Sequence, residues 1–155
     1  MNSNIFFLPF IGRYYANGGL FGKRIMILGE SHYCDGGCCD CRLCRQCAKF
    51  TQNVLRDFLD ERKERQNWMR TFVKFERSLV GKMTDWALRR KIWNSVMFYN
   101  YLQVAMTGPR KAGTSAQYKQ AANAFFEVID EYEPECIIVW GKRLWELMII
   151  TGSLN

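Results

Sequence analysis

Three short apolar runs along the chain have the length of buried strands. They cover residues 24–28, 95–100 and 136–140, and the first and third end directly at Gly29 and near Gly141. A run of this length that is bounded by glycine or by a polar loop favours a strand over a helix. The pattern therefore predicts three buried strands separated by longer stretches of chain.

Between and after these runs, apolar residues recur at helical spacing. One helix is expected over residues 48–61, a second begins near Ser115, which can cap it, and ends at Pro134, and a third covers residues 142–150. Strands that alternate with helices predict an α/β fold, here a three-layer α/β/α arrangement with a short central parallel sheet. Ligands of such sheets bind at the carboxyl ends of the strands, which correspond here to residues 29–33, 100–101 and 140–141.

Length and composition indicate one globular domain over residues 1–155. Apolar residues make up 48% of the chain and aromatic residues 15%, which is typical of a chain with a substantial core. No segment is apolar for long enough to span a bilayer, and the start of the chain has no signal-peptide pattern. We therefore expect no membrane contact and a location in the reducing cytoplasm.

The charge points to an anionic partner. The formal net charge is +7, and an excess of this size suggests an anionic partner such as nucleic acid or an anionic membrane surface, with simple solubility of a basic protein as the alternative. Residues 56–93 hold many of the cations, interleaved with tryptophan and phenylalanine, a mixture that can follow a phosphate backbone and stack on bases. The alternative is a solvated face of mixed charge whose aromatic residues point into the core. The candidate nucleic-acid-binding residues are Arg62, Lys63, Arg65, Arg89, Arg90 and Lys91.

A cysteine-rich loop follows the first predicted strand. Residues 34–47 hold six of the seven cysteines in the chain, at Cys34, Cys38, Cys39, Cys41, Cys44 and Cys47. In a reducing compartment such a cluster favours a metal or redox site over a disulfide framework. Thiolates bind zinc in sets of four, usually as two pairs brought together by a longer loop. The run from Cys41 to Cys47 is also similar to the ligand run of an iron–sulfur cluster.

We therefore expect the loop at 34–47 to bind a metal, with zinc as the first expectation, an iron–sulfur cluster as the alternative, and the choice of four cysteines left open. The alternative to metal binding is that these cysteines are free or partly oxidised thiols. His32, the only histidine of the chain, lies beside this loop and is a candidate ligand, site residue or packed residue.

The order of motifs resembles the uracil-DNA glycosylase superfamily. In that family the first strand ends in a water-activating loop of the type Gly-Gln-Asp-Pro-Tyr or Gly-Glu-Ala-Pro-Gly, and Ile27-Leu-Gly-Glu-Ser-His-Tyr33 stands in its place. Met97-Phe-Tyr-Asn-Tyr-Leu102 is similar to the segment whose Asn reads the base. Phe125-Phe-x-x-Ile129 and Ile137-Ile-Val-Trp-Gly-Lys142 are similar to the helix and strand that follow.

The resemblance implies a DNA-binding protein that flips a damaged base out of the duplex, reads its polar edge in a pocket and hydrolyses the N-glycosidic bond. Carried over by position, Glu30 is the acidic residue of the first loop, and Glu30, Ser31 and His32 are the candidate catalytic residues. Tyr33 matches the aromatic wall of the pocket. Asn100 matches the base-reading residue, whose amide offers both a donor and an acceptor.

The chain departs from the family at two places. Ser31 and His32 replace the usual third residue and the proline, and the family's His-Pro-Ser loop is absent, so the sheet is expected to lack the family's last strand. Three hypotheses follow: a DNA glycosylase-like enzyme, a non-catalytic nucleic-acid-binding module on the same fold, and a metal- or redox-responsive protein.

Overall fold

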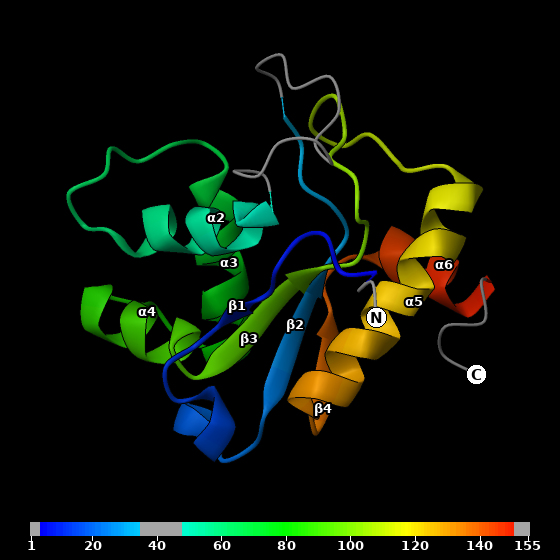
Figure 1. Cartoon of the computed structure of the whole chain (residues 1–155). Helices are drawn as coiled ribbons and strands as arrows, with labels where there is room; N and C mark the ends of the chain where they lie inside the picture. The colour runs from blue at the N-terminus through cyan, green and yellow to red at the C-terminus, as the bar shows by residue number, and fades with distance from the viewer. Residues whose placement is uncertain (1–3, 35–47, 151–155) are drawn as a thin grey trace.

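The computed structural model describes residues 4–34 and 48–150 as a mixed α/β fold around a small open sheet (Figure 1). The four strands are β1 (Phe10–Ile11), β2 (Ile25–Gly29), β3 (Val96–Asn100) and β4 (Cys136–Val139), in the order β1-β3-β2-β4. β2 pairs in parallel with both β3 and β4, and β1 pairs with β3 in antiparallel orientation. The predicted α/β class and the three predicted strands are confirmed.

The register places the carboxyl ends of the parallel strands at one edge of the sheet. Gly29 at the end of β2 lies opposite Asn100 at the end of β3, and Leu28 lies opposite Val139 of β4. The backbone N–H of Trp140 then donates to the carbonyl of Leu28 at 2.8 Å. Residues that directly follow the three strands are therefore brought together, as the strand pattern implies.

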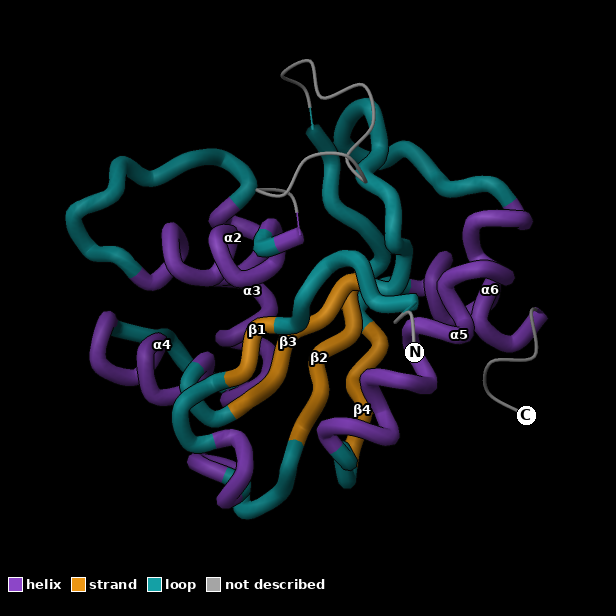
Figure 2. The backbone as a smooth tube through the Cα atoms, in the orientation of Figure 1, coloured by secondary structure: helices purple, strands orange, loops and turns teal. Residues whose placement is uncertain are grey.

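Helices cover both faces of the sheet, which makes the described fold a three-layer arrangement (Figure 2). Between β2 and β3 the chain forms α2 (Phe50–Leu59), α3 (Met69–Val80) and α4 (Trp86–Trp93) on one side. On the other side lie α5 (Ser115–Tyr132) and α6 (Lys142–Ile150). Two short 3₁₀ turns, η1 (Tyr15–Asn17) and η2 (Gly19–Phe21), precede β2.

Strand alternation divides the core into two clusters. Side chains of β2 and β3 point in turn to opposite faces, so Met26 and Met97 pack with α5 and α6, whereas Ile27 and Phe98 pack with the helices of the other layer. Both strands are buried along their whole length. This double burial explains why they read in the sequence as continuous apolar runs rather than as alternating patterns.

The helices α3 and α4 were not predicted, because this part of the sequence stands out only as a basic stretch. Two local details also differ. Thr114, not Ser115, caps α5: its hydroxyl accepts from the backbone N–H of Gln117, whose side chain accepts from the Thr114 N–H, forming a capping box. The short strand β1 was not predicted, because two residues after Pro9 carry no readable alternation. Among the described helices, none is long and apolar enough to cross a membrane.

Candidate functional site

A cavity of about 590 Å³ opens at the carboxyl edge of the sheet, between the ends of the parallel strands and the layer formed by α2 and α3. It is lined by all five residues that the sequence singled out at the strand ends: Glu30, Ser31, His32, Tyr33 and Asn100. The topology thus brings the candidate catalytic and base-binding residues to one place.

Aromatic rings form much of the cavity wall. Phe50, Trp68, Phe72, Phe98 and Trp140 all line it. The ring of Phe72 lies 5.2 Å from Trp140, 5.6 Å from Phe98 and 5.6 Å from Trp68, at the steep interplanar angles that aromatic pairs prefer. A wall of this kind presents flat apolar surface to a planar ligand.

Several lining residues come from the helical layer and were not predicted as site residues. Phe50, Asn53, Val54 and Asp57 belong to α2, and Gln66 lies in the segment before α3. Their helical spacing in the sequence marks α2 as amphipathic but carries no sign that one side of it borders a cavity. Their role follows only from the way α2 packs over the ends of β2 and β3.

Asn100 is buried in the cavity wall at the end of β3. Its Nδ2 lies 3.1 Å from Nδ1 and 3.2 Å from Nε2 of His32. Its Oδ1 lies over Gly29 so closely that a Cβ at position 29 would approach it to 2.2 Å. No described residue donates a hydrogen bond to Oδ1, so this oxygen is an acceptor without a donor in the described part of the chain.

His32 is enclosed rather than exposed. Its Nε2 lies 2.8 Å from Oγ1 of Thr51 on α2, and the rings of Phe7 and Phe50 lie 5.1 Å and 4.5 Å away. Burial lowers the pKa of His32 to about 3, because desolvation disfavours the charged imidazolium. The ring is therefore neutral at physiological pH and is bonded on the protein side by Thr51 and Asn100.

Glu30 is turned toward the opposite helical layer. Its carboxylate accepts from Arg143 of α6, with Nε at 2.8 Å from Oε1 and Nη2 at 2.7 Å from Oε2, and also from the hydroxyl of Tyr118 on α5. The hydrogen bond to Glu30 raises the pKa of Arg143. Burial, followed by the hydrogen bond that the Tyr118 hydroxyl donates to Glu30, raises the pKa of Tyr118. Both carboxylate oxygens are thus occupied by donors.

The first loop continues along the rim of the cavity. Tyr33 is partly exposed and pairs with Met106 in a short parallel bridge, and the N–H of Cys34 donates to the carbonyl of Met106 at 2.9 Å. Cys34 is half-buried with a free thiol. The other predicted metal ligands, Cys38, Cys39, Cys41, Cys44 and Cys47, lie outside the described residues. The described part of the chain contains no group of three or more metal-ligating side chains.

Most of the predicted nucleic-acid-binding cations have partners within the protein. Arg62 bonds Asp60 at 3.0 Å, Lys63 bonds Asp57 at 3.4 Å and Arg90 bonds Glu61 at 2.8 Å. The hydrogen bonds from Arg62 lower the pKa of Asp60 to about 2. These pairs are exposed to solvent, and pairs of this kind exchange readily with water or another anion.

Arg65 and Arg89 are held by a cluster around Trp86. The guanidinium of Arg65 lies 4.2 Å from the centre of the Trp86 ring, and that of Arg89 lies 4.9 Å from it. Arg89 is buried and bonds Glu76 at 2.8 Å, which also accepts from Trp93 at 2.9 Å. Arg89 is therefore enclosed and does not face a phosphate backbone, whereas Lys91 is exposed.

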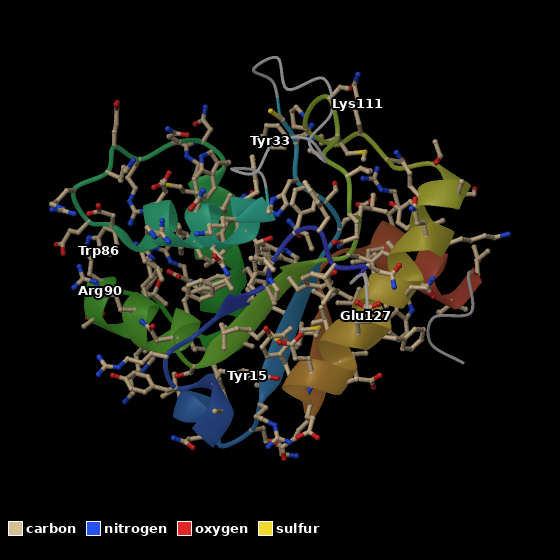
Figure 3. All side chains as sticks on the ribbon, in the orientation of Figure 1. Tyr15, Tyr33, Trp86, Arg90, Lys111 and Glu127 are labelled. Carbon is tan, nitrogen blue, oxygen red and sulfur yellow. The ribbon has the colours of Figure 1, made fainter. Side chains whose placement is uncertain are left out.

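A second basic segment lies nearer the cavity. Residues 107–114 connect Met106, which pairs with Tyr33, to α5. The carbonyls of Arg110 and Lys111 in this segment accept from Arg143 at 3.2 Å and 3.5 Å. Figure 3 shows Lys111 and Tyr33 on the same side of the molecule, whereas Trp86 and Arg90 lie on the α4 side. The side chains of Arg110 and Lys111 are exposed. From the sequence, no role was assigned to this segment.

Comparison of the chain with protein-family models, with curated proteins and with solved structures found no match. The function of the cavity has to be inferred from its own residues and their geometry.

Proposed function

We propose that the chain is a nucleic-acid-binding domain that holds an unpaired base in the cavity at the carboxyl edge of its sheet. The observation that carries this proposal is Asn100, a buried amide in an aromatic-lined cavity whose oxygen receives no hydrogen bond from any residue that the structure describes. A planar ligand with a polar edge matches both properties of the cavity. The motif resemblance to uracil-DNA glycosylases supports the same class of ligand.

The shape and lining of the cavity fit an extruded base. About 590 Å³ is within the range of cavities that hold small ligands. Stacking on aromatic side chains stabilises a base by about 1–3 kcal/mol, and Phe50, Phe72 and Trp140 offer such surfaces. An amide in the wall adds selectivity for the polar edge of the base, because a base that cannot bond to it leaves a buried polar atom without a partner.

No lysine or arginine is among the described residues that line the cavity, so cations that bind backbone phosphates have to come from the segments next to it. The loop holding Arg110 and Lys111 is tied to α6 through Arg143, so its two exposed cations are presented from an anchored backbone. Lys49 precedes α2 on the other side of the cavity and is exposed as well. Affinity for DNA should therefore fall steeply as salt increases.

Base hydrolysis is the second candidate, because Glu30 and Ser31 line the same cavity as Asn100. A carboxylate that stabilises an oxocarbenium ion or activates water must face the sugar. The bonds from Arg143 and Tyr118 hold the Glu30 carboxylate toward α5 and α6 instead. Base binding without hydrolysis is therefore the function that this geometry favours, and a catalytic form requires Glu30 to leave Arg143.

Binding of oligonucleotides that carry one uracil or hypoxanthine tests the proposal. We expect Asn100→Ala to weaken binding of the uracil-containing strand about tenfold, the effect of losing one buried hydrogen-bond partner. Asn123→Ala, at an exposed position on α5, is the matched control and should leave the affinity unchanged. Equal affinities for all three proteins would overturn base binding in the cavity.

Release of free base from the same oligonucleotides distinguishes the enzyme from the binder. A glycosylase would release base in wild type and lose this activity in Glu30→Gln. Binding without release in either protein is the result we expect.

A further inference from the structure

Three buried polar side chains form a line that crosses from the helical layer to the sheet. Thr51 of α2 is 0% exposed, His32 of the first loop 5%, and Asn100 of β3 5%. The contacts along the line are 2.8 Å between Thr51 Oγ1 and His32 Nε2, and 3.1 Å between His32 Nδ1 and Asn100 Nδ2. Buried polar groups that are bonded in series orient one another.

The hydrogen-bonding capacity of these groups assigns a direction to the line. The Nδ2 of an asparagine amide only donates, so the imidazole nitrogen that it bonds must carry a lone pair. A neutral imidazole has one acceptor nitrogen and one N–H. Asn100 Nδ2 lies at nearly equal distances from Nδ1 (3.1 Å) and Nε2 (3.2 Å), so the amide contact alone does not choose between them. Among the described residues Nε2 has a second partner, Oγ1 of Thr51 at 2.8 Å, which can accept a proton, whereas the amide Nδ2 cannot. The arrangement that satisfies both contacts places the lone pair on Nδ1 and the proton on Nε2, which donates to Thr51.

The orientation of the amide decides what the cavity can accept. With Nδ2 held by His32, Oδ1 lies over Gly29. Gly29 lines the cavity beside Asn100 and has no side chain that could cover the oxygen. An amide turned by half a rotation would present N–H groups there instead, and would select ligands of the opposite hydrogen-bonding pattern.

We infer that His32 and Thr51 are positioning residues that hold the Asn100 amide with its oxygen toward the ligand. This inference rests on the proposed function, and it gives His32 a role that does not include proton transfer. The preferred ligand edge then donates a ring N–H, as uracil and hypoxanthine do, and does not present a ring nitrogen acceptor, as cytosine does.

Thr51→Val is the sharpest test, because it removes the hydroxyl while keeping the shape of the side chain. Selectivity is measured as the ratio of Kd values for single-stranded oligonucleotides that carry cytosine or uracil at one position. We expect wild type to prefer uracil about tenfold and Thr51→Val to lose most of this preference. Thr51→Ser, which restores the hydroxyl, should recover it. A Thr51→Val protein that keeps the full wild-type ratio would overturn the inference.

His32→Phe gives an independent readout, because it preserves an aromatic ring between Phe7 and Phe50 but removes both nitrogens. Selectivity should fall in this variant as in Thr51→Val, and neither change should reduce it further in an Asn100→Ala background. A His32→Phe protein with undiminished preference for uracil would contradict the assignment.

The tautomer can be measured without any substitution, since His32 is the only histidine in the chain. The ¹⁵N chemical shifts of its ring should show an unprotonated Nδ1 and a protonated Nε2, and a proton on Nδ1 would overturn the inference. If Asn100→Ala binds the uracil-containing strand as tightly as wild type, the proposed function fails together with this inference. If wild type prefers uracil through Asn100 but Thr51→Val leaves that preference intact, only the positioning role fails.

Discussion

Replacing Gly29 by alanine places one methyl group at the most crowded point of the cavity floor. A Cβ built on Gly29 lies 2.2 Å from Oδ1 of Asn100, 3.4 Å from its Cγ and 3.3 Å from Cζ of Phe98. Ordinary contacts between carbon and oxygen are about 1 Å longer than the first of these distances. Gly29→Ala therefore requires Asn100 to move or the β2–β3 register to open.

The expected cost follows from what has to move. Displacing the amide breaks its 3.1 Å bond to His32, worth about 1 kcal/mol. Overpacking a rigid sheet costs about 1–3 kcal/mol. Alanine recovers about 0.5–1 kcal/mol relative to glycine in a strand. The net effect should be about 1–3 kcal/mol of lost unfolding free energy, together with loss of the uracil preference.

Urea denaturation followed by circular dichroism measures the stability term, and oligonucleotide binding measures the site. Gly108→Ala is the matched control, because the nearest atom to its added Cβ is 3.8 Å away, on the flexible Lys111 side chain. Gly29→Ala should cost less in an Asn100→Ala background, since the colliding oxygen is then gone. A Gly29→Ala protein with wild-type stability and wild-type selectivity would refute the reasoning.

Glu76→Ala breaks the buried pair with Arg89 and should lower the free energy of unfolding by about 3–5 kcal/mol, because an unpaired buried cation remains. Glu61→Ala breaks an exposed pair and should lower it by under about 1 kcal/mol in the same urea experiment. The His32 pKa is lowered to about 3 from 6.5, so the unfolded chain takes up a proton that the folded chain excludes. Stability should therefore decrease as pH falls below about 6.5, by up to about 1.4 kcal/mol per pH unit. The NMR resonances of the His32 ring should not titrate between pH 5 and pH 8, and a titration midpoint near 6.5 would contradict the buried environment. Elemental analysis should find about one zinc per chain. Cys44→Ser should lower the metal content, whereas Cys136→Ser, at the exposed start of β4, should leave it unchanged. Iron in place of zinc would favour an iron–sulfur cluster, and a protein without metal would refute both expectations.

Most of the fold could be predicted from the sequence, because it depends on local pattern. Short apolar runs that end in glycine marked β2 and β4, and alternation with helical segments implied parallel strands whose carboxyl ends meet. The convergence of Glu30 and Asn100 on one cavity follows from that topology alone. The strand β1 escaped prediction because its existence depends on pairing with β3, more than eighty residues away.

The roles of the site residues depended on contacts that no local pattern records. Arg143 bonds Glu30 across 113 residues of chain. This bond directs the Glu30 carboxylate toward α6, away from the position that a catalytic carboxylate would need. Thr51 reaches His32 only because α2 packs over the end of β2. Arg89, which reads as one more cation in a basic stretch, is buried against Glu76 because helices α3 and α4 pack together.

The sequence by itself determined which residues stand at the strand ends, since strand positions follow from hydrophobic runs. Only the tertiary structure decided which of those side chains are free to meet a ligand and which are bound within the protein. The physical reason is that hydrogen bonds and ion pairs act over about 3 Å in space without regard to separation along the chain. Within residues 4–34 and 48–150, no donor bonds the side-chain oxygen of Asn100, whereas both carboxylate oxygens of Glu30 accept from donors.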